Sequence, residues 1–440
     1  MFGTFCACLF IMRNFLYTSR VILLIVAFSG LVLLCGGCGG GGGSVASTVK
    51  STTAPVSSSD PITVVDQAKQ SGKWTILVYM DADNDLESYA IDNINQMESV
   101  GSTKDVRIVV QIDRTPGYDS SNGDWTDTRR YLITKDNDPA HITSLRLDAA
   151  QPLGELDMAD PRNLKNFVEW GAKTFPAEHY CVILWNHGTG WEFTIPTTPS
   201  FNANYVLSDD SSGNAMNVTD IPNALSTVKP DILAFDACYM QQVEIAYQLR
   251  NSAGYMVGST GAVPSSGFNY SGFLSQISSN SSPVQVGESI VDTFMSANRN
   301  YKAVQMSMVD LSKMDSVAAA ANQFSNTLLA NQANWSSLIE KARAQSYDYS
   351  ASGGTKKRYL IDLAGYADKC SNLMGSGIDQ AASGLRQSVE SAVVAEGHSS
   401  DSTGATGLSV FLPKSGNYDS AYKRLDFAKV TSWDNLISSM

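Results

Sequence analysis

Cysteine is scarce in the part of this chain that could fold. The sequence has 440 residues and seven cysteines, of which four precede residue 39 and three follow: Cys181, Cys238 and Cys370. Small secreted folds held together by disulfides are therefore excluded. A bridge between Cys181 and Cys370 is one alternative, but Cys181 opens a strand-like run, where a buried free thiol is the commoner occupant.

Positive charge is also scarce. The chain has 31 lysines and arginines against 43 aspartates and glutamates, which gives a formal net charge of -12. Nucleic acid and anionic membrane surfaces both require a basic face, so neither is expected as a partner of the folded body. An acidic protein is better suited to basic substrates.

The N-terminal apolar run, residues 21–34, is shorter than the roughly 20 residues that a transmembrane helix needs. It follows Arg13 and Arg20 and precedes small residues, which is the order of a cleavable secretory signal. We therefore predict that residues 1–38 are a signal peptide and that the protein is exported.

The end of this segment resembles a bacterial lipoprotein signal, in which the cysteine after the cleavage point carries a lipid. Cys38 is the expected lipidation site because Gly37 is a small residue before it, whereas Cys35 follows a bulky residue. The resemblance implies a cell-envelope lipoprotein that touches the membrane only through this N-terminal anchor. A plain cleaved signal, and hence a secreted protein, is the alternative, and both Met1 and Met12 remain as start sites.

Residues 39–70 consist mainly of Gly, Ser, Thr, Val, Ala and Pro without apolar periodicity, which predicts a flexible linker. From residue 71 onward, apolar runs of strand length alternate with helical patterns. Near-continuous apolar strands separated by helices are typical of an α/β fold with a mainly parallel sheet flanked by helices. Strands are expected at residues 74–80, 106–113, 129–134 (antiparallel), 180–185, 231–235 and 254–259, with a helix at 163–174.

Two chemically reactive side chains follow strands of this predicted sheet. His187 comes after the run at 180–185, and Cys238 comes after the run at 231–235, about 50 residues later, as in the caspase pattern. The carboxyl ends of parallel strands meet at one edge of a sheet, so a His and a Cys placed there can perform thiolate catalysis. Helical spacing after Cys238 predicts that this cysteine lies at or just before a helix N-terminus, where the dipole lowers the thiol pKa. Taken singly, a buried structural Cys or His is the alternative.

The chain resembles the clostripain family of cysteine peptidases in four motifs that occur in the family's order. They lie at residues 79–87 (YMDADNDLE), 186–188 (NHG), 236–240 (DACYM) and 407–413 (GLSVFLP). The resemblance extends from about residue 71 to residue 440. It implies the caspase-like fold shared by caspases, gingipains and legumain, and an endopeptidase activity that cleaves after Arg or Lys. We assign a catalytic core to 71–275 and a mostly helical C-terminal region to 276–440, with a late strand at 407–413 that returns to the sheet of the same peptidase unit.

The resemblance also implies roles for single residues. Cys238 is the expected nucleophile and His187 its general acid and base, with no third member evident. The backbone N–H groups of Gly188 and Cys238 are the expected oxyanion donors, since glycine lets the chain approach a substrate carbonyl. Asp236, two positions before the nucleophile, is the expected S1 residue that pairs with a basic P1 side chain. Its alternative is a cap on the following helix.

Asp81, Asp83 and Asp85 have the spacing of calcium ligands, but the loop lacks the Gly and Glu that an EF-hand requires. We therefore expect a turn and helix-capping role and no cofactor, with calcium as the alternative.

Residues 191–228 contain no Lys or Arg, although family members are often processed between the His and Cys motifs after a basic residue. We therefore predict that the mature enzyme is a single chain. The stretch at 258–270 resembles the family's substrate-binding segment, but it lacks the acidic residues expected near Thr260. A surface-binding protein whose activity has lapsed is the alternative to an enzyme; the presence of both Cys238 and His187 favours the enzyme.

Overall fold

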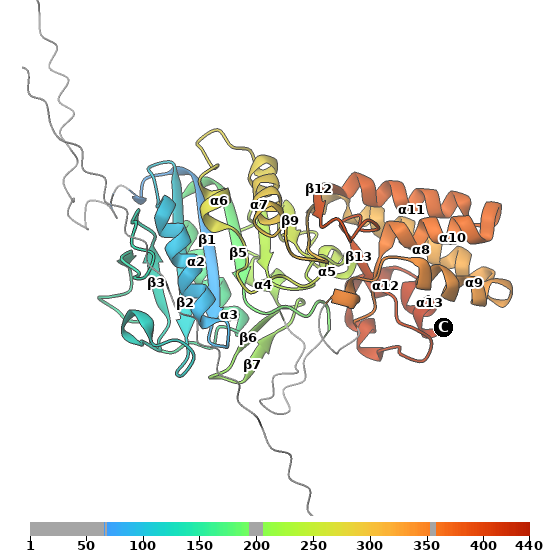
Figure 1. Cartoon of the computed structure of the whole chain (residues 1–440), viewed down its shortest axis with the longest axis horizontal. Coiled ribbons are helices and arrows are strands. Elements are labelled where there is room, and N and C mark those ends of the chain that lie inside the picture. Colours follow the sequence, from blue (N-terminus) through green and yellow to red (C-terminus); the bar gives the residue numbers. More distant parts are fainter. Residues whose placement is uncertain (1–65, 67, 193–205, 353–357) are drawn as a thin grey trace, which may run out of the picture. The chain divides into compact units, whose positions relative to one another are not determined.

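Nine strands form one mixed sheet at the centre of the structure (Figure 1). The computed structural model describes residues 66, 68–192, 206–352 and 358–440, so the predicted signal peptide, Cys38 and nearly all of the predicted linker lie outside it. In spatial order the strands are β12 (Val393–His398), β10 (Gln305–Asp310), β9 (Tyr255–Gly258), β8 (Ile232–Asp236), β5 (Ala177–Trp185), β1 (Gly72–Ala82), β2 (Val106–Arg114), β3 (Arg129–Leu132) and β4 (Leu145–Arg146).

The middle of the sheet is parallel. Strands β9, β8, β5, β1 and β2 pair in parallel, whereas β3 and β4 at one edge and β10 and β12 at the other are antiparallel to their neighbours. The predicted α/β class, a parallel sheet flanked by helices, is confirmed. The antiparallel pairing expected for residues 129–134 is also confirmed, by β3.

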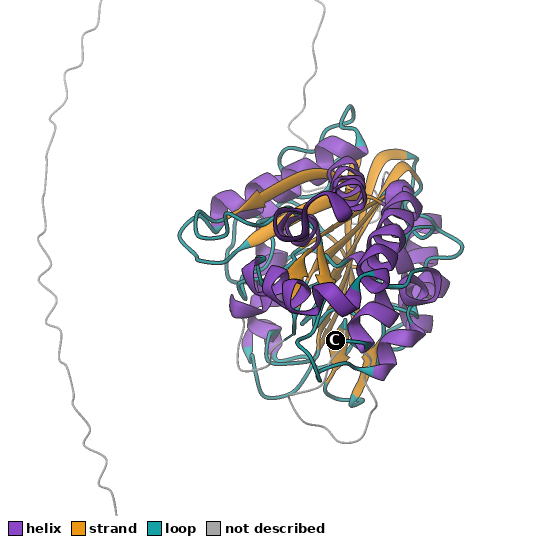
Figure 2. Ribbon diagram, turned by 90° about the vertical axis from the view of Figure 1, so that its right-hand side faces the viewer, coloured by secondary structure: helices purple, strands orange, loops and turns teal. Residues whose placement is uncertain are grey.

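Helices cover both faces because the central strands are apolar on both sides (Figure 2). Along β1, Ile76 and Val78 pack on one face and Leu77 and Tyr79 on the other, and all four are fully buried. The first face packs against α2 (Glu87–Val100), α6 (Tyr270–Leu274) and α7 (Pro283–Ala297). The second packs against α3 (Pro161–Thr174), α4 (Ile221–Ala224) and α5 (Val243–Gln248).

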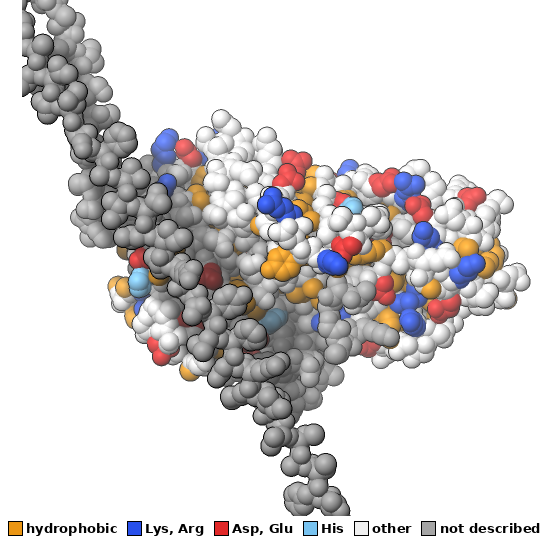
Figure 3. All heavy atoms as spheres, viewed as in Figure 1, with side chains coloured by type: hydrophobic (Ala, Val, Ile, Leu, Met, Phe, Trp, Pro, Cys, Tyr) orange, Lys and Arg blue, Asp and Glu red, His pale blue; other side chains and the backbone are white. Residues whose placement is uncertain are grey.

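Helices also dominate the C-terminal part of the chain. They are α8 (Met314–Ala330), α9 (Gln332–Gln345), α10 (Leu363–Met374), α11 (Asp379–Ala392), α12 (Asp426–Val430) and α13 (Trp433–Ser438), and they extend the core of the second face. Short 3-10 helices lie at Ser121–Gly123, Leu311–Lys313, Tyr349–Ser352, Gly375–Gly377 and Ser420–Arg424. On the face shown in Figure 3, acidic and basic side chains are interspersed over this C-terminal part.

The late strand does not return to the central sheet, so that prediction was wrong. Strand β13 (Ser409–Phe411) pairs antiparallel with β11 (Leu360–Asp362) in a separate two-stranded sheet. It lies beside the segment that follows β8, where the Ser409 N–H donates to the Gln241 carbonyl (3.2 Å). The central sheet is instead extended by β10 and β12, with β12 at its edge, and both strands come from the stretch expected to be helical.

The contacts between residues gather Ser58–Met440 into one compact unit. Strands from both sides of residue 275 share the central sheet, and the division into a core and a C-terminal region at that residue stays a prediction. A further hairpin, β6 (Leu207–Asp209) and β7 (Asn214–Met216), forms a separate two-stranded sheet, which contacts the end of β1. Within the described residues, no helix combines the length and the apolar character needed to span a membrane.

Candidate active site

The order of the parallel strands reverses at one place in the sheet. The chain goes from β1 to β2 on one side, and then through β5, β8 and β9 on the other. In open α/β sheets, ligands bind outside the carboxyl ends of the strands at such a reversal. The crevice between the ends of β1 and β5 is therefore where the fold itself predicts a site.

Strand register places His187 and Cys238 at the same height above this edge. Trp185, the last residue of β5, is aligned with Asp236, the last residue of β8. His187 and Cys238 each lie two positions beyond this aligned pair. The two side chains predicted from the sequence to be reactive are thus brought to one cleft, which both of them line.

Gly188 lets the two loops meet. A Cβ atom at this position would lie 2.3 Å from the Cys238 carbonyl oxygen and 2.9 Å from the Cys238 nitrogen. These are backbone atoms that cannot turn aside, so only glycine fits without moving the loop that carries the cysteine. On the other side of Cys238, Tyr239 has a positive φ of 62°, which marks a tight turn at the cysteine.

The Cys238 thiol is half-buried and held by the opposite wall of the cleft. Its Sγ accepts a hydrogen bond from the Val263 N–H (3.2 Å). Burial raises the pKa of the Cys238 thiol, while this N–H and the Arg358 guanidinium act against that rise. The expected helix N-terminus is not at this residue: α5 begins only at Val243, so the prediction that a helix dipole lowers the thiol pKa was wrong.

His187 has a carboxylate partner that the sequence did not reveal. Its Nε2 lies 2.7 Å from Asp85 Oδ1, and the two side chains are 39% and 51% exposed. The preceding Asn186 anchors the loop, because its Nδ2 donates to the carbonyls of Asp81 (3.0 Å) and Ser208 (2.9 Å). The position of His187 is therefore set twice: Asp85 holds its ring, and Asn186 holds the backbone just before it.

Asp236 is a buried carboxylate in the wall of the same cleft. It is 4% exposed, and it accepts hydrogen bonds from the Phe268 N–H and the Tyr270 hydroxyl (3.0 Å). Burial raises the pKa of Asp236 to about 7, and these two donors act against the rise. Gly267 has a φ of 64°, and a Cβ there would come within 2.5 Å of the carboxylate. The Asp236 side chain therefore does not cap the following helix, which was the alternative.

The cleft is lined by both predicted motifs and by the predicted substrate-binding stretch. Within the described residues, the other lining residues are Trp185, the last residue of β5, and Leu86, which directly precedes α2. The lining residues are Leu86, Trp185, Asn186, His187, Asp236, Ala237, Cys238, Val263, Pro264, Ser265 and Gly267.

Arg358 approaches this region from far along the chain. Its guanidinium carbon lies 4.6 Å from the centre of the Tyr239 ring, and its Nη1 donates to the Thr189 carbonyl (2.9 Å). It thereby connects the loop after His187 with the turn after Cys238. No motif around this arginine marked it in the sequence; only the fold brings it to the site.

The three aspartates that follow β1 divide between two places. Asp85 contacts His187, whereas Asp83 joins Asp113, Glu155 and Asp209, with one carboxylate oxygen from each lying within 4.8 Å of the others. The predicted helix-capping role was wrong, because α2 begins after Leu86 without a side-chain cap. The residues that could hold a cation are therefore not the triplet expected from the sequence.

Comparison with known proteins agrees with this geometry. The model of the clostripain family, Peptidase_C11, matches residues 78–439. Clostripain from Hathewaya histolytica is 26% identical to this chain over an alignment 455 residues long, gaps included. The alignment covers 89% of this chain and 85% of that protein.

Solved structures of similar proteins share the fold. A secreted C11 cysteine protease from Bacteroides thetaiotaomicron, in complex with an irreversible peptide inhibitor, has a TM-score of 0.62 and 22% identity, over 82% of this chain and 99% of that chain. An inactive zymogen C11 protease from Parabacteroides distasonis has a TM-score of 0.62 and 20% identity over the same shares of the two chains.

Proposed function

This chain belongs to the clostripain family and is a cysteine endopeptidase, and from that premise we propose that it cleaves peptide bonds after Arg or Lys. In this proposal Cys238 is the nucleophile and His187 is its acid and base. The observation that carries it is the convergence of His187, Cys238 and the buried Asp236 in one cleft at the strand-order reversal.

The contact with Asp85 assigns the two ring nitrogens of His187. Because Nε2 donates its proton to Asp85 Oδ1, Nδ1 is the nitrogen that exchanges protons with the reacting groups. Nδ1 takes the thiol proton as Sγ attacks the carbonyl carbon of the scissile bond. It then gives this proton to the leaving amine, which departs and leaves an acyl-enzyme. Water attacks the thioester, with its proton passing through Nδ1 back to the sulfur.

The pKa of Cys238 determines when this proton moves. Burial raises the pKa of the Cys238 thiol, which favours the protonated thiol in the free enzyme. In this proposal, proton transfer to His187 is coupled to the attack of Sγ on the substrate.

In this proposal, the backbone N–H groups of Gly188 and Cys238 stabilise the tetrahedral oxyanion. These N–H groups belong to two loops that pack closely together because Gly188 has no Cβ atom. Within the described parts of the chain, neither N–H has a hydrogen-bond acceptor. Donors that are fixed by the backbone and still free can bind developing charge without reorganising.

Selectivity for a basic P1 side chain is the role we assign to Asp236. Its carboxylate is almost completely buried, and no cation pairs with it within the described residues. A guanidinium or ammonium entering the cleft supplies the missing positive charge, and a buried charge pair is much stronger than an exposed one. Acidic P1 side chains are rejected by like-charge repulsion.

The proposal is tested with fluorogenic peptides that differ only at P1, which is Arg, Lys, Asn or Asp. We expect turnover after Arg and Lys, and a loss of kcat/KM of at least about 10³-fold in Cys238→Ala and in His187→Ala. Cys370→Ala is the matched control, since Cys370 is a buried thiol on α10, remote from the cleft. Absence of turnover by the wild type, or turnover only after Asn or Asp, would overturn the proposal.

We further propose that the protein is exported and anchored by a lipid on Cys38. The signal-like N-terminus supports export, and one relative is described as secreted. Labelling of producing cells with radioactive palmitate should mark the wild type and spare Cys38→Ala. Unlabelled wild-type protein released into the medium would contradict the lipid anchor and support a plain signal.

A single-chain mature enzyme is also part of the proposal, since residues 191–228 offer no basic cleavage point. A denaturing gel of the active protein should show one band from the folded unit. A new N-terminus between residues 191 and 228 would contradict this.

A further inference from the structure

Arg358 contacts the residue that follows each of the two expected oxyanion donors. Gly188 is followed by Thr189, whose carbonyl accepts a hydrogen bond from Arg358 Nη1 (2.9 Å). Cys238 is followed by Tyr239, and the guanidinium carbon of Arg358 lies 4.6 Å from the centre of the Tyr239 ring. Arg358 itself does not line the cleft. It can therefore act on the reaction only through these two loops and through its charge.

The turn that contains Tyr239 depends on contacts to keep its conformation. Tyr239 has a φ of 62°, in a region that residues other than glycine rarely adopt, and it is almost fully buried. Its N–H donates to the Gly261 carbonyl, and its own carbonyl accepts from Gln242 Nε2, both at 2.8 Å. These two contacts hold the backbone. The guanidinium of Arg358, which comes from a distant part of the chain, holds the ring.

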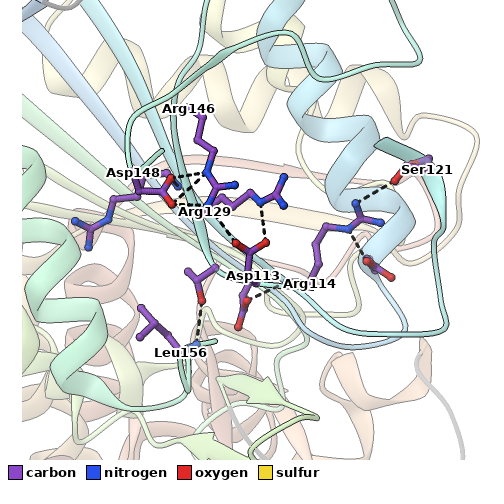
Figure 4. Close-up of polar contacts among 11 residues, drawn as sticks. Asp113, Arg114, Ser121, Arg129, Arg146, Asp148 and Leu156 are labelled. Carbon is purple, nitrogen blue, oxygen red and sulfur yellow. Dashed lines mark hydrogen bonds and ion pairs between the residues drawn. The ribbon is translucent and has the colours of Figure 1, made fainter. Parts of the chain in front are cut away.

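The charge of Arg358 is less completely neutralised than that of Arg146 at the edge of the central sheet. Figure 4 shows Arg146 directed to Asp148, with which it makes an ion pair at 2.8 Å. The side chain of Arg358 is 15% exposed, and its ion pair with Glu192 spans 3.8 Å, which is longer than a hydrogen bond. Its Nε is buried and has no hydrogen-bond partner among the described residues. Such a cation can still stabilise another negative charge nearby.

The Cys238 thiol is a group on which this charge acts. Burial raises the pKa of the thiol and Asp236 adds to the rise, whereas the Val263 N–H and the positive charge of Arg358 act against it. The other titratable side chains near the thiol are His187 in the same cleft and Tyr239 directly after it. When Sγ loses its proton and attacks, negative charge develops on the sulfur, and a cation nearby favours this step.

We propose that Arg358 is a positioning residue of the active site, which holds together the two loops that carry the expected oxyanion donors and places a positive charge near Cys238. This inference rests on the proposed function, because it takes Cys238 as the nucleophile. The planar guanidinium donates to Thr189 while its face lies over Tyr239. A lysine ammonium keeps the charge but cannot make both contacts at once. Substitution can therefore separate the two parts of the role.

The charge is tested by the rate at which iodoacetamide alkylates Cys238 in the full chain across a range of pH, with the labelled residue located by mass spectrometry. Alkylation needs no peptide substrate, and its rate follows the fraction of thiolate. In Arg358→Met the profile should move to higher pH, and the rate at pH 7 should fall about threefold. Arg358→Lys should keep the wild-type profile. Arg386→Met is the control, since Arg386 is a half-exposed arginine on α11 that does not line the cleft.

The contacts are tested by peptide turnover. Arg358→Met and Arg358→Lys should both lose about tenfold in kcat/KM on peptides that the wild type cleaves, because neither side chain can hold Thr189 and Tyr239 together. The ratio of Arg to Asn cleavage at P1 should stay at the wild-type value, since Asp236 is unchanged. Arg386→Met should cleave as the wild type does.

Three outcomes would overturn the proposal. They are a wild-type alkylation profile in Arg358→Met, a profile in Arg358→Lys displaced as far as that of Arg358→Met, and wild-type kcat/KM in Arg358→Lys. If Arg358→Met does not fold, Arg358→Lys decides by itself, through wild-type alkylation combined with reduced kcat/KM. Failure of the proposed function would instead be seen in the wild type, as an absence of turnover, and the alkylation rates would still test the charge of Arg358.

Discussion

The cleft and the group formed by Asp83, Asp113, Glu155 and Asp209, the acid cluster, both place buried carboxylates at the carboxyl edge of the same sheet, but in different surroundings. In the cleft, Asp236 stands alone and receives hydrogen bonds from Phe268 and Tyr270. In the acid cluster, Asp83, Asp113 and Asp209 crowd together with Glu155, and some of their oxygens have no donor.

This difference separates two ways of using buried negative charge. A single carboxylate that already accepts hydrogen bonds can bind a positive charge reversibly, and a basic substrate side chain provides such a charge. In the acid cluster, burial and the repulsion of Glu155 and Asp209 raise the pKa of Asp113 to about 9, so this carboxyl holds a proton at neutral pH. We therefore assign a transient basic guest to the carboxylate of the cleft and bound protons to the acid cluster.

Among substitutions that leave Cys238 and His187 in place, removing the carboxylate of the cleft should have the largest effect. Asp236→Asn leaves a basic P1 side chain without its buried partner, a loss of about 3–5 kcal/mol, or roughly 10²- to 4 × 10³-fold in kcat/KM for Arg and Lys peptides. The same change in the cluster, Asp113→Asn, should leave the ratio of Arg to Asn cleavage as it is. Both effects are measured by the kinetics of cleavage of peptides that differ only at P1. If the ratio of Arg to Asn cleavage were the same in Asp236→Asn and wild type, Asp236 would not determine P1 selectivity.

A methyl group at Gly188 should be nearly as harmful. Because its Cβ would lie 2.3 Å from the Cys238 carbonyl oxygen, Gly188→Ala must displace the nucleophile loop. A displacement of about 1 Å costs on the order of 10²-fold in rate, and it should affect Arg and Lys peptides equally. Gly384→Ala, which meets no atom within 4 Å, is the matched control. Unchanged kcat/KM in Gly188→Ala would show that the two loops need not touch.

The pH dependence of cleavage should report the ionisation of Asp236. Its pKa is raised to about 7, so in the free enzyme the carboxyl is mostly neutral at pH 6 and mostly ionised at pH 8. For Arg peptides, this group should make kcat/KM fall by up to about tenfold per pH unit below 7. The comparison of wild type with Asp236→Asn, in which this limb should vanish, isolates it from the ionisation of the thiol.

The same raised pKa has a defined sign for stability. The folded state holds the Asp236 proton more tightly than the unfolded state does, so its contribution to stability is present at low pH. That contribution is lost as the pH rises from the unfolded value toward about 7.

The smallest effect is expected at Asp85. Asp85→Asn keeps the shape but removes the charge that orients His187, and the pair is largely exposed. Such pairs contribute about 1 kcal/mol at most, so kcat should fall about fivefold while KM changes little. Steady-state kinetics decide the matter: a change in KM alone would place Asp85 in substrate binding instead.

Much of this fold was predictable, because the central strands are continuous apolar runs that only a sheet covered on both faces can bury. His187 and Cys238 could be located for the same reason, since strand ends gather at one edge. The turn after Cys238 was not predictable: helical spacing continues through it, but Tyr239 adopts a positive φ and postpones α5 to Val243.

The errors concern contacts between segments that are far apart in the chain. The sequence of strand β13 is as apolar as that of a central strand, which suggested the central sheet. Tertiary packing pairs it with β11 instead. Likewise, β10 and the edge strand β12 are short strands in a stretch of the chain that is mostly helical, where the apolar pattern of a strand is hardest to recognise. Arg358 and the acid cluster depend on side chains from separate elements, and nothing in local spacing reports that they meet.

The most direct test of the central claim is covalent labelling with two peptidyl chloromethyl ketones that differ only in carrying Arg or Asp at P1. Mass spectrometry of the digested protein should locate the Arg reagent on Cys238, with Asp236→Asn labelled far more slowly and the Asp reagent not incorporated. Labelling of a different residue, or equal labelling of Cys238 by both reagents, would contradict a cysteine peptidase whose selectivity for basic side chains depends on Asp236.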